Sequence, residues 1–292
     1  MKNILVKALR KTLNILPPTL PPKVYNFLIK MPVLRTILNK IIKSVAPAYL
    51  DIGPGKIIFN KNDPVMTAWV SFGSFEPQTV DLYKKSLREG MNVVDIGANI
   101  GYYTIIGGKM IGTNGKIFSY EPDEDNFYYL ETNVRSNDLK NAHVLKLALS
   151  DSIGKRKLYL GDEKCTNHSF GDNSKTGKTE LVETDTLDNN LKRFGSPKID
   201  VIKIDIEGDE ILAIEGMKET IARNPNIIIL TEFYPKAIKR LGKSPVQYLT
   251  RLQTMGFYLL FIDEDNAELT TLNDFDAFVS NFPDDENARN IL

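Results

Sequence analysis

The sequence of 292 residues is poor in the residue types that disulfides, zinc sites and membrane spans require. It has one cysteine, Cys165, only two histidines and no CxxC pair. A single cysteine excludes an intrachain disulfide and favours a reducing compartment, and the missing Cys/His spacing argues against a zinc site. No apolar run reaches the about 18 residues that a membrane-spanning helix needs. The sequence therefore indicates a protein without structural disulfides, zinc or a transmembrane segment.

Charge is balanced overall but unevenly placed along the chain. There are 37 basic and 37 acidic residues, yet residues 1–50 hold nine Lys or Arg and no acid. The remainder is net acidic and would repel phosphates, so nucleic acid is not expected as a partner. Lys7, Arg10 and Lys11 interrupt the apolar stretch that a signal peptide would need. We therefore predict a cytoplasmic location.

The basic N-terminus reads as helical. Residues 1–16 have the pattern of a basic amphipathic helix that Pro17–Pro22 ends, and a second basic, apolar segment spans Lys23–Val45 with a break near Pro32. Such helices often lie in the membrane interface, with lysines near anionic lipid, so peripheral contact with the inner face of the membrane through residues 1–46 is one interpretation. Packing of these helices on the rest of the chain is the other.

The rest of the chain is organised around one strand, turn and helix. Met91–Ile96 reads as a buried strand, and the run Ile100–Ile111 has helical spacing. The glycines between them, Gly97 and Gly101, permit close approach of a ligand, and amides at a helix start offer free donors. Asp95 stands at the carboxyl end of the strand, where open α/β sheets bind ligands.

The next strand-like run ends in a second acid. Lys116–Tyr120 is followed by Glu121, which is placed to hold a ribose diol through charge-assisted hydrogen bonds. The Asp-x-Gly-x-x-x-Gly spacing differs from that of dinucleotide-binding turns and phosphate loops. Together these features indicate an adenosine-containing ligand with a cationic end. Taken singly, Asp95 and Glu121 could equally be helix caps.

A later strand-like run, Asp200–Ile204, leads into two further acids. In an extended chain Lys203, Asp205 and Glu207 share one face, so the lysine can keep the carboxylates ionised. The alternative is that Asp205 caps the following helix and that Lys203 is part of a structural ion pair.

Strand-like and helix-like runs alternate over most of the chain, which predicts an α/β fold with a mostly parallel sheet covered by helices on both faces. Asn226–Thr231 is the most apolar strand and Glu232 ends it. Upstream, Ala68–Phe72 reads as a strand and Thr79–Arg88 as a helix. The chain from Glu264 onward is acidic and less patterned.

Several segments in order resemble the motifs of FkbM-type S-adenosylmethionine-dependent methyltransferases: Phe72–Pro77, Asp95–Thr104, Glu121-Pro122, Ala148–Asp151, Asp185–Asp188 and Lys203–Glu210. The resemblance implies a Rossmann-like methyltransferase domain over residues 51–270, between a basic helical extension (1–50) and an acidic C-terminal tail (271–292). It also implies S-adenosylmethionine as cofactor and O-methylation of a sugar, a glycan or a lipid-linked metabolite.

The resemblance also implies roles for particular residues. Gly97, Asn99 and Gly101 would cradle the methionine and ribose parts of the cofactor, with Asp95 near its ammonium. Further cofactor contacts would come from four polar residues, Glu76, Glu121, Ser150 and Asp151. An acceptor hydroxyl needs a base because its pKa is high, and the candidates at the strand ends are Asp205, Glu207 and Glu232.

His168, in the polar loop Gly161–Thr179, is a further candidate base, although a solvated loop histidine is the commoner case. The acids Asp205, Glu207, Asp209 and Glu232 could hold a hard cation, but without a fixed spacing no metal is predicted. A binding module without turnover and a nicotinamide-dependent oxidoreductase are the alternative functions.

Overall fold

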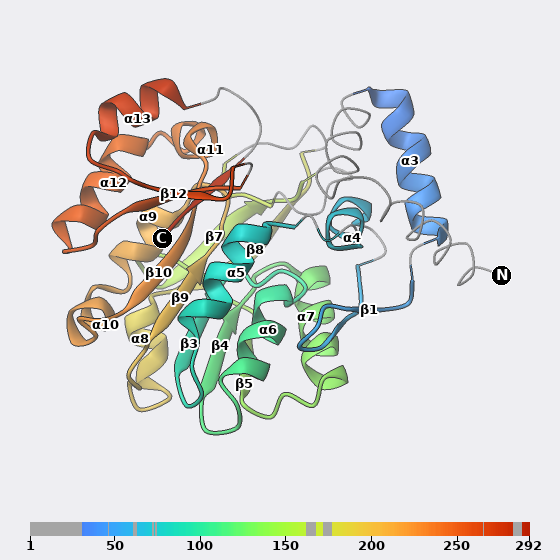
Figure 1. Ribbon diagram of the computed structural model, residues 1–292, viewed down its shortest axis with the longest axis horizontal. Helices are drawn as coiled ribbons and strands as arrows, with labels where there is room; N and C mark the ends of the chain where they lie inside the picture. Colours follow the sequence, from blue (N-terminus) through green and yellow to red (C-terminus); the bar gives the residue numbers. More distant parts are fainter. Residues whose placement is uncertain are drawn as a thin grey trace.

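The computed structural model describes residues 31–45, 47–60, 63–71, 73, 75–161, 168–171, 177–264, 266–282 and 288–292. The helix expected over residues 1–16 lies outside these ranges. The predicted α/β class is confirmed: a mostly parallel central sheet carries helices on both faces (Figure 1).

The central sheet has eight strands in the order β12-β11-β13-β10-β9-β3-β4-β5. Neighbours from β10 to β5 run parallel, whereas β13 is antiparallel to both β10 and β11. The strands are β3 (Asn92–Ile96), β4 (Lys116–Tyr120), β5 (Ala142–Leu145), β9 (Val201–Ile204), β10 (Ile228–Phe233), β11 (Leu260–Asp263), β12 (Glu268–Thr271) and β13 (Arg289–Ile291).

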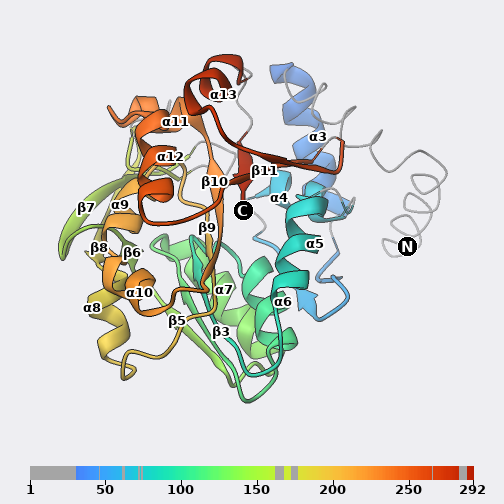
Figure 2. The same cartoon turned by 60° about the vertical axis from the view of Figure 1, so that its left-hand side comes forward.

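Side chains that alternate along each strand fill two cores. Val93 of β3 belongs to the core under α5 (Pro77–Ser86) and α6 (Tyr102–Met110), and Val94 belongs to the core on the opposite face. Four helices cover that opposite face (Figure 2): α8 (Leu187–Lys192), α9 (Glu210–Glu215), α10 (Lys218–Arg223) and α12 (Pro245–Thr254). The remaining helices of this part are α7 (Glu124–Ser136) beside β5, α11 (Pro235–Arg240) and α13 (Phe275–Asn281).

Smaller elements surround this sheet. A second sheet has the order β6-β8-β7, with β6 (Ala148–Leu149), β7 (Gly154–Tyr159) and β8 (Thr179–Asp185). Near the N-terminus, a short antiparallel pair is formed by β1 (Leu50–Asp51) and β2 (Lys56–Ile57), and α3 (Pro32–Val45) contacts α4 (Pro64–Ser71). Within the described ranges no helix has the length and apolar character to cross a membrane.

The strand expected over Ala68–Phe72 was wrong, because Ala68 lies inside the helix α4. The carboxylate of Asp63 accepts hydrogen bonds from the amides of Val65 and Met66, at 3.0 and 2.9 Å. An acid that satisfies the first amides of a helix favours helix over strand at that point. This capping overrode the strand propensity of the apolar run.

The chain after Glu264 is more ordered than its sequence pattern suggested. It contains β12, α13 and β13, and β13 lies inside the central sheet: Ile291 pairs with Thr231 of β10 and with Phe261 of β11. Residues Arg289–Ile291 are therefore part of the central sheet rather than an appendage to it.

Candidate active site

Four ionisable residues project from the same face of the sheet at the carboxyl ends of its strands. The register pairs Asp95 with Lys203, and Lys203 with Leu230. Because side chains alternate along a strand, Asp205 and Glu232, each two residues further on, share that face. This is the face that α5 and α6 cover. The topology thus collects three acids and one lysine in one place.

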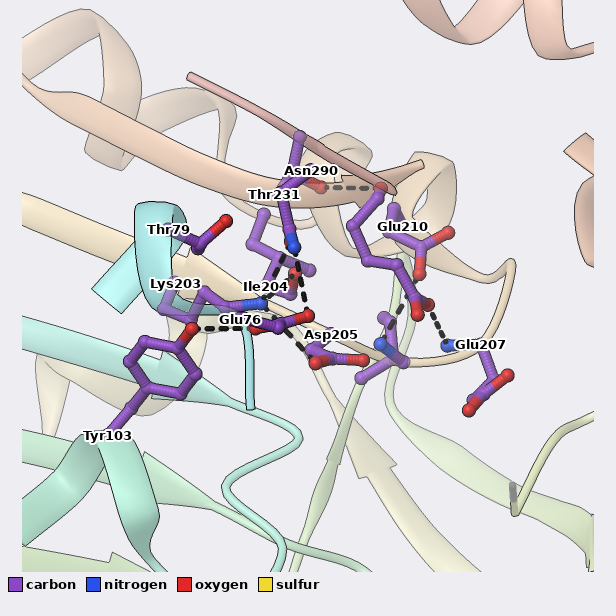
Figure 3. Close-up of polar contacts among 12 residues, drawn as sticks. Glu76, Thr79, Tyr103, Lys203, Ile204, Asp205, Glu207, Glu210, Thr231 and Asn290 are labelled. Atoms are coloured by element: carbon purple, nitrogen blue, oxygen red, sulfur yellow. Dashed lines mark hydrogen bonds and ion pairs between the residues drawn. The ribbon is translucent and has the colours of Figure 1, made fainter. Parts of the chain in front are cut away.

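Lys203 is fully buried, and its ammonium lies between hydrogen-bond acceptors (Figure 3). Its Nζ is 3.3 Å from Oδ2 of Asp205, 3.4 Å from Oδ1 of Asn290 and 3.5 Å from the carbonyl oxygen of Ile204. It also lies 5.1 Å from the centre of the Tyr103 ring. An ammonium has three protons to donate, so these acceptors account for all of them.

The charge of this lysine is balanced by its surroundings. Burial on its own lowers the pKa of Lys203, but the nearby carboxylates of Asp205, Glu76 and Glu232 raise it above its ordinary value. A buried ammonium is tolerated only with such compensation. Lys203 therefore stays charged throughout the physiological pH range.

Glu76 reaches the same cluster from the start of α5. It occupies the N-cap position with a left-handed backbone (φ 42°), yet its side chain does not cap the helix. The carboxylate of Glu264 does so, accepting from the amide of Thr79 at 2.9 Å. The Glu76 carboxylate instead accepts from the Tyr103 hydroxyl at 2.6 Å and from Nδ2 of Asn290 at 2.9 Å (Figure 3).

The glycine turn after β3 lies against the backbone that follows β9. A Cβ added to Gly97 (φ +77°) would lie 1.9 Å from the carbonyl oxygen of Asp205. The turn's amides, expected to be free for a ligand, are used within the protein: those of Gly97 and Ala98 donate to the Tyr120 carbonyl, both at 3.0 Å. The amide of Gly101 also donates internally, to the carbonyl of Ala98 at 2.8 Å. This expectation is therefore corrected for these three positions.

Glu121 ties the glycine turn to the end of β4. Its carboxylate accepts from the amide of Asn99 at 2.8 Å and from that of Asp123 at 2.9 Å. Burial raises the pKa of Glu121 to about 8, although the two amide donors oppose the shift. The residue expected to hold the ribose diol thus lies at the glycine turn, as the sequence motif required.

Asp95 is buried at the start of the same turn. Its carboxylate accepts from the hydroxyl of Thr104 at 2.6 Å, and that hydroxyl is 2.8 Å from the hydroxyl of Ser119. Burial raises the pKa of Asp95 to about 6. Burial thus opposes ionisation of this acid, and a bound cation would offset that effect.

Glu207 and Glu232 meet beyond the end of β9. The chain leaves its extended path at Glu207 (φ 56°), whose amide donates to Oε2 of Glu232 at 3.2 Å. Burial, followed by the neighbouring Asp205, raises the pKa of both glutamates well above the ordinary value. Glu210 accepts from the Gly208 amide at 3.0 Å and has a pKa raised to about 7 by burial. Burial and the neighbouring acids thus oppose ionisation of both Glu207 and Glu232.

His168 lies beside the acid that follows β4. The amide of Gly161 donates to its Nδ1 at 3.1 Å, and its Nε2 is 3.9 Å from Oδ2 of Asp123. Burial lowers the pKa of His168, against the effect of Asp123. The next residue, Ser169, donates to the carbonyl of Glu207 at 3.2 Å, so this loop also borders the acidic cluster. The role of His168 as a base stays a prediction.

Ser150 contacts the small sheet, whereas Asp151 is exposed and accepts from the hydroxyls of its neighbours Ser150 and Ser152. The Ser150 amide donates to the Asp185 carbonyl at 2.9 Å, and its hydroxyl accepts from Arg156 at 3.3 Å. Arg156 in turn pairs with the buried Asp209. The structure thus groups Ser150 with β7 and with Asp209 at the start of α9, and the expected contact of Ser150 and Asp151 with the adenine edge stays a prediction.

Two members of the cluster, Tyr103 and Asn290, were not singled out from the sequence. Tyr103 lies within the motif Asp95–Thr104, so the sequence motif could have identified it. No sequence signal identifies Asn290, because it belongs to a three-residue strand whose position is set by pairing with distant strands. Among the described residues no group of three or more His, Cys, Asp or Glu is arranged to hold a metal ion.

Comparison with known proteins matches the chain to the family described as Methyltransferase FkbM domain over residues 95–259, more than half of its length. A probable cobalt-precorrin-6B C(15)-methyltransferase (decarboxylating) from Sulfurisphaera tokodaii is 25% identical over 179 residues, 54% of this chain and 88% of that protein. Methyltransferase sdnD from Sordaria araneosa is 25% identical over 177 residues, 50% and 68% of the two chains. A solved SAM-dependent methyltransferase from Aquifex aeolicus has a TM-score of 0.36 and 19% identity, covering 62% of this chain and 80% of that one.

Proposed function

The chain belongs to the FkbM methyltransferase family, and on that premise we propose that it methylates a hydroxyl of a sugar, a glycan or a lipid-linked metabolite. It is an S-adenosylmethionine-dependent methyltransferase. The observation that carries the proposed acceptor chemistry is the acidic cluster at the ends of β9 and β10. There the carboxylate of Asp205 is 29% exposed while its lysine partner is fully buried.

The residues around the glycine turn fit the cofactor. Glu121 stands at the turn for a ribose diol, and Asp95 is a buried carboxylate that a cationic ammonium would complement. When bound, the cofactor supplies an electrophilic methyl group on a positively charged sulfur. We place Gly97, Asn99 and Gly101 beside its methionine and ribose parts.

The acids at the strand ends serve the acceptor in this proposal. In the transfer, an oxygen–carbon bond forms, the sulfur–carbon bond breaks, and the hydroxyl proton passes to a protein carboxylate. The Asp205 side chain is 29% exposed, whereas burial raises the pKa of Glu207 and Glu232 well above the ordinary value. Protonated glutamates can donate hydrogen bonds that orient the acceptor, and an ionised carboxylate can take the proton.

A carbon acceptor is the second candidate, because the relative from Sulfurisphaera tokodaii is described as a C(15)-methyltransferase. Product analysis separates the two: an O-methyl group on a sugar survives as a methyl ether, whereas a C-methyl group adds to the carbon skeleton.

The lipid-linked form of the acceptor is proposed from the N-terminal segment. Residues 1–50 carry no acid, and α3 exposes four apolar side chains: Val33, Leu34, Ile37 and Ile41. Exposed apolar residues on a basic helix are typical of contact with an anionic membrane surface.

Mass spectrometry of extracted glycans and glycolipids tests the proposed function. Extracts of cells that express the protein should contain a species heavier by one methyl group than in cells lacking it, and expression of Asp205→Asn should not restore that species. A methylated product that is found in all three extracts, or that carries the methyl group on carbon, would contradict the hydroxyl acceptor.

A further inference from the structure

We infer that Asn290, on the strand β13, is a positioning residue that holds Lys203 and, through it, the carboxylate of Asp205 toward the acceptor hydroxyl. This inference rests on the proposed function, since it concerns the base of that reaction. It joins three parts of the chain that are distant in sequence: the start of α5, the end of β9 and the residues around 290.

The position of Asn290 follows from the sheet. It pairs with Glu232 of β10 on one side and with Ile262 of β11 on the other. Residues directly opposite in an antiparallel pair point to the same face. The Asn290 side chain therefore enters the cluster on the face that carries Asp95, Lys203 and Asp205, and it is buried there.

The amide of Asn290 connects two charges of opposite sign. Its Nδ2 donates to Oε1 of Glu76 at 2.9 Å, and its Oδ1 accepts from Nζ of Lys203 at 3.4 Å (Figure 3). The opposite orientation of the amide would set its oxygen against the carboxylate and its NH₂ against the ammonium. Only one orientation is thus compatible with both neighbours, and only a side chain with a donor and an acceptor can fill the place.

The hydrogen bonds form a relay with a fixed direction. The Tyr103 hydroxyl and the Asn290 amide each donate to one oxygen of Glu76, so Glu76 acts as an acceptor at both oxygens. Lys203 donates to Asn290 and to Asp205. Lys203 is fully buried and its third acceptor is the carbonyl of Ile204, so Lys203 too is a positioning residue.

Asp205 is the end of the relay that faces outward. Its Oδ2 is held by Lys203, and its side chain keeps 29% exposure, whereas Glu232 is 6% exposed. The ion pair with the buried ammonium holds this carboxylate in one orientation. Loss of the relay at Asn290 would let Lys203 move and would leave Glu76 without one of its two donors.

Three variants test the relay. Asn290→Asp keeps the shape but replaces the donor facing Glu76 with an oxygen. Glu76→Gln turns the partner into an amide. The double variant Glu76→Gln/Asn290→Asp has the amide at position 76 and the carboxylate at position 290. Its total charge equals that of the wild type. Asn273→Asp adds the same charge at an exposed position outside the cluster and is the matched control.

The rate is measured as transfer of label from methyl-tritiated S-adenosylmethionine to a total lipid and glycan extract of cells lacking the protein. We expect Asn290→Asp to lower the maximal rate at least about tenfold, with the KM for S-adenosylmethionine within about twofold of wild type. The double variant should recover to within about threefold, and Asn273→Asp should match wild type. An unchanged KM for S-adenosylmethionine in all variants would show that the cofactor site is still folded. The lower rate would then come from lost positioning of the carboxylate.

A second readout follows the lysine itself. In ¹⁵N-lysine-labelled protein, the buried and hydrogen-bonded ammonium of Lys203 should give a slowly exchanging signal that is absent from Lys203→Met. The signal should disappear in Asn290→Ala and return in the double variant. A wild-type rate in Asn290→Asp would overturn the inference, and so would a double variant that regains the lysine signal but not the rate. Wild-type protein that labels no component of the extract overturns the proposed acceptor chemistry itself, and the inference with it.

Discussion

At the scale of single residues, the site depends on backbone segments that lie in direct contact. Gly97 and the carbonyl of Asp205 leave no room for a side chain between the cofactor turn and the acid strand. The sequence predicted Gly97, Asp95 and Glu121 because each lies at, or directly after, the carboxyl end of an apolar strand. It could not predict Asn290, because no local pattern places an asparagine opposite a strand 58 residues earlier.

Gly97→Ala should destabilise the protein and weaken its binding of S-adenosylhomocysteine, because the new methyl group would overlap the Asp205 carbonyl. Gly90→Ala is the matched control, since Gly90 has a similar backbone (φ +82°) with nothing within 4 Å of an added Cβ. Both variants bear the cost of a left-handed alanine, of order 1 kcal/mol. Urea unfolding should show an additional loss of about 1–2 kcal/mol in Gly97→Ala alone; equal losses in the two variants would contradict the close contact.

Glu121 should make stability fall as the pH rises. Its folded-state pKa of about 8 lies above the ordinary value of 4.5, so the stabilisation is complete below pH 4.5 and is lost as the pH rises towards 8. For one carboxyl group the slope approaches about 1.4 kcal/mol per pH unit. The free energy of unfolding, measured in urea from pH 5 to 8, should therefore fall less steeply for Glu121→Gln than for wild type. Parallel curves would show that Glu121 titrates normally.

At the scale of elements, sequence pattern was informative where a strand or helix is set by its own residues. β4 was predicted with its observed bounds, and the strand–turn–helix unit around Gly97 was found within two residues at each end. The sequence pattern predicted a strand where α4 lies, because the effect of the helix cap Asp63 exceeded the strand propensity of the apolar run. It did not predict β13, which is too short to have a pattern of its own. Its place is fixed by pairing with β10 and β11.

The insertion of β13 between two strands predicts a large effect at Ile291. This residue is 1% exposed, while Leu269 on the edge strand β12 is 47% exposed. Replacing a buried isoleucine with alanine costs about 2–5 kcal/mol, and the same change at an exposed position costs far less. We expect Ile291→Ala to lose at least about 2 kcal/mol of unfolding free energy and Leu269→Ala less than about 1. Similar small losses would mean that β13 is only loosely held.

At the scale of the whole molecule, charge separates the N-terminal segment from the rest. All nine basic residues of the first fifty lie on a segment without acids, whereas the candidate active site collects carboxylates around the buried Lys203. Membrane contact through residues 1–46 stays a prediction that follows from the first of these features.

Co-sedimentation with vesicles measures that contact. The full chain should sediment with vesicles that contain phosphatidylserine, and less so at high salt because screening weakens attraction to anionic lipid. A chain that starts at residue 47 should remain in the supernatant. Sedimentation that does not change on this deletion would remove the proposed role of the segment.

The position of β13 near the C-terminal end of the sequence also has a consequence for folding during synthesis. During synthesis the cofactor turn, the acid strand and the lysine all leave the ribosome before residue 290 does. If Asn290 holds that lysine, a nascent chain that already has its glycine turn and the acids at its strand ends still cannot align them. Methyl transfer would then begin only after β13 has paired with β10 and β11.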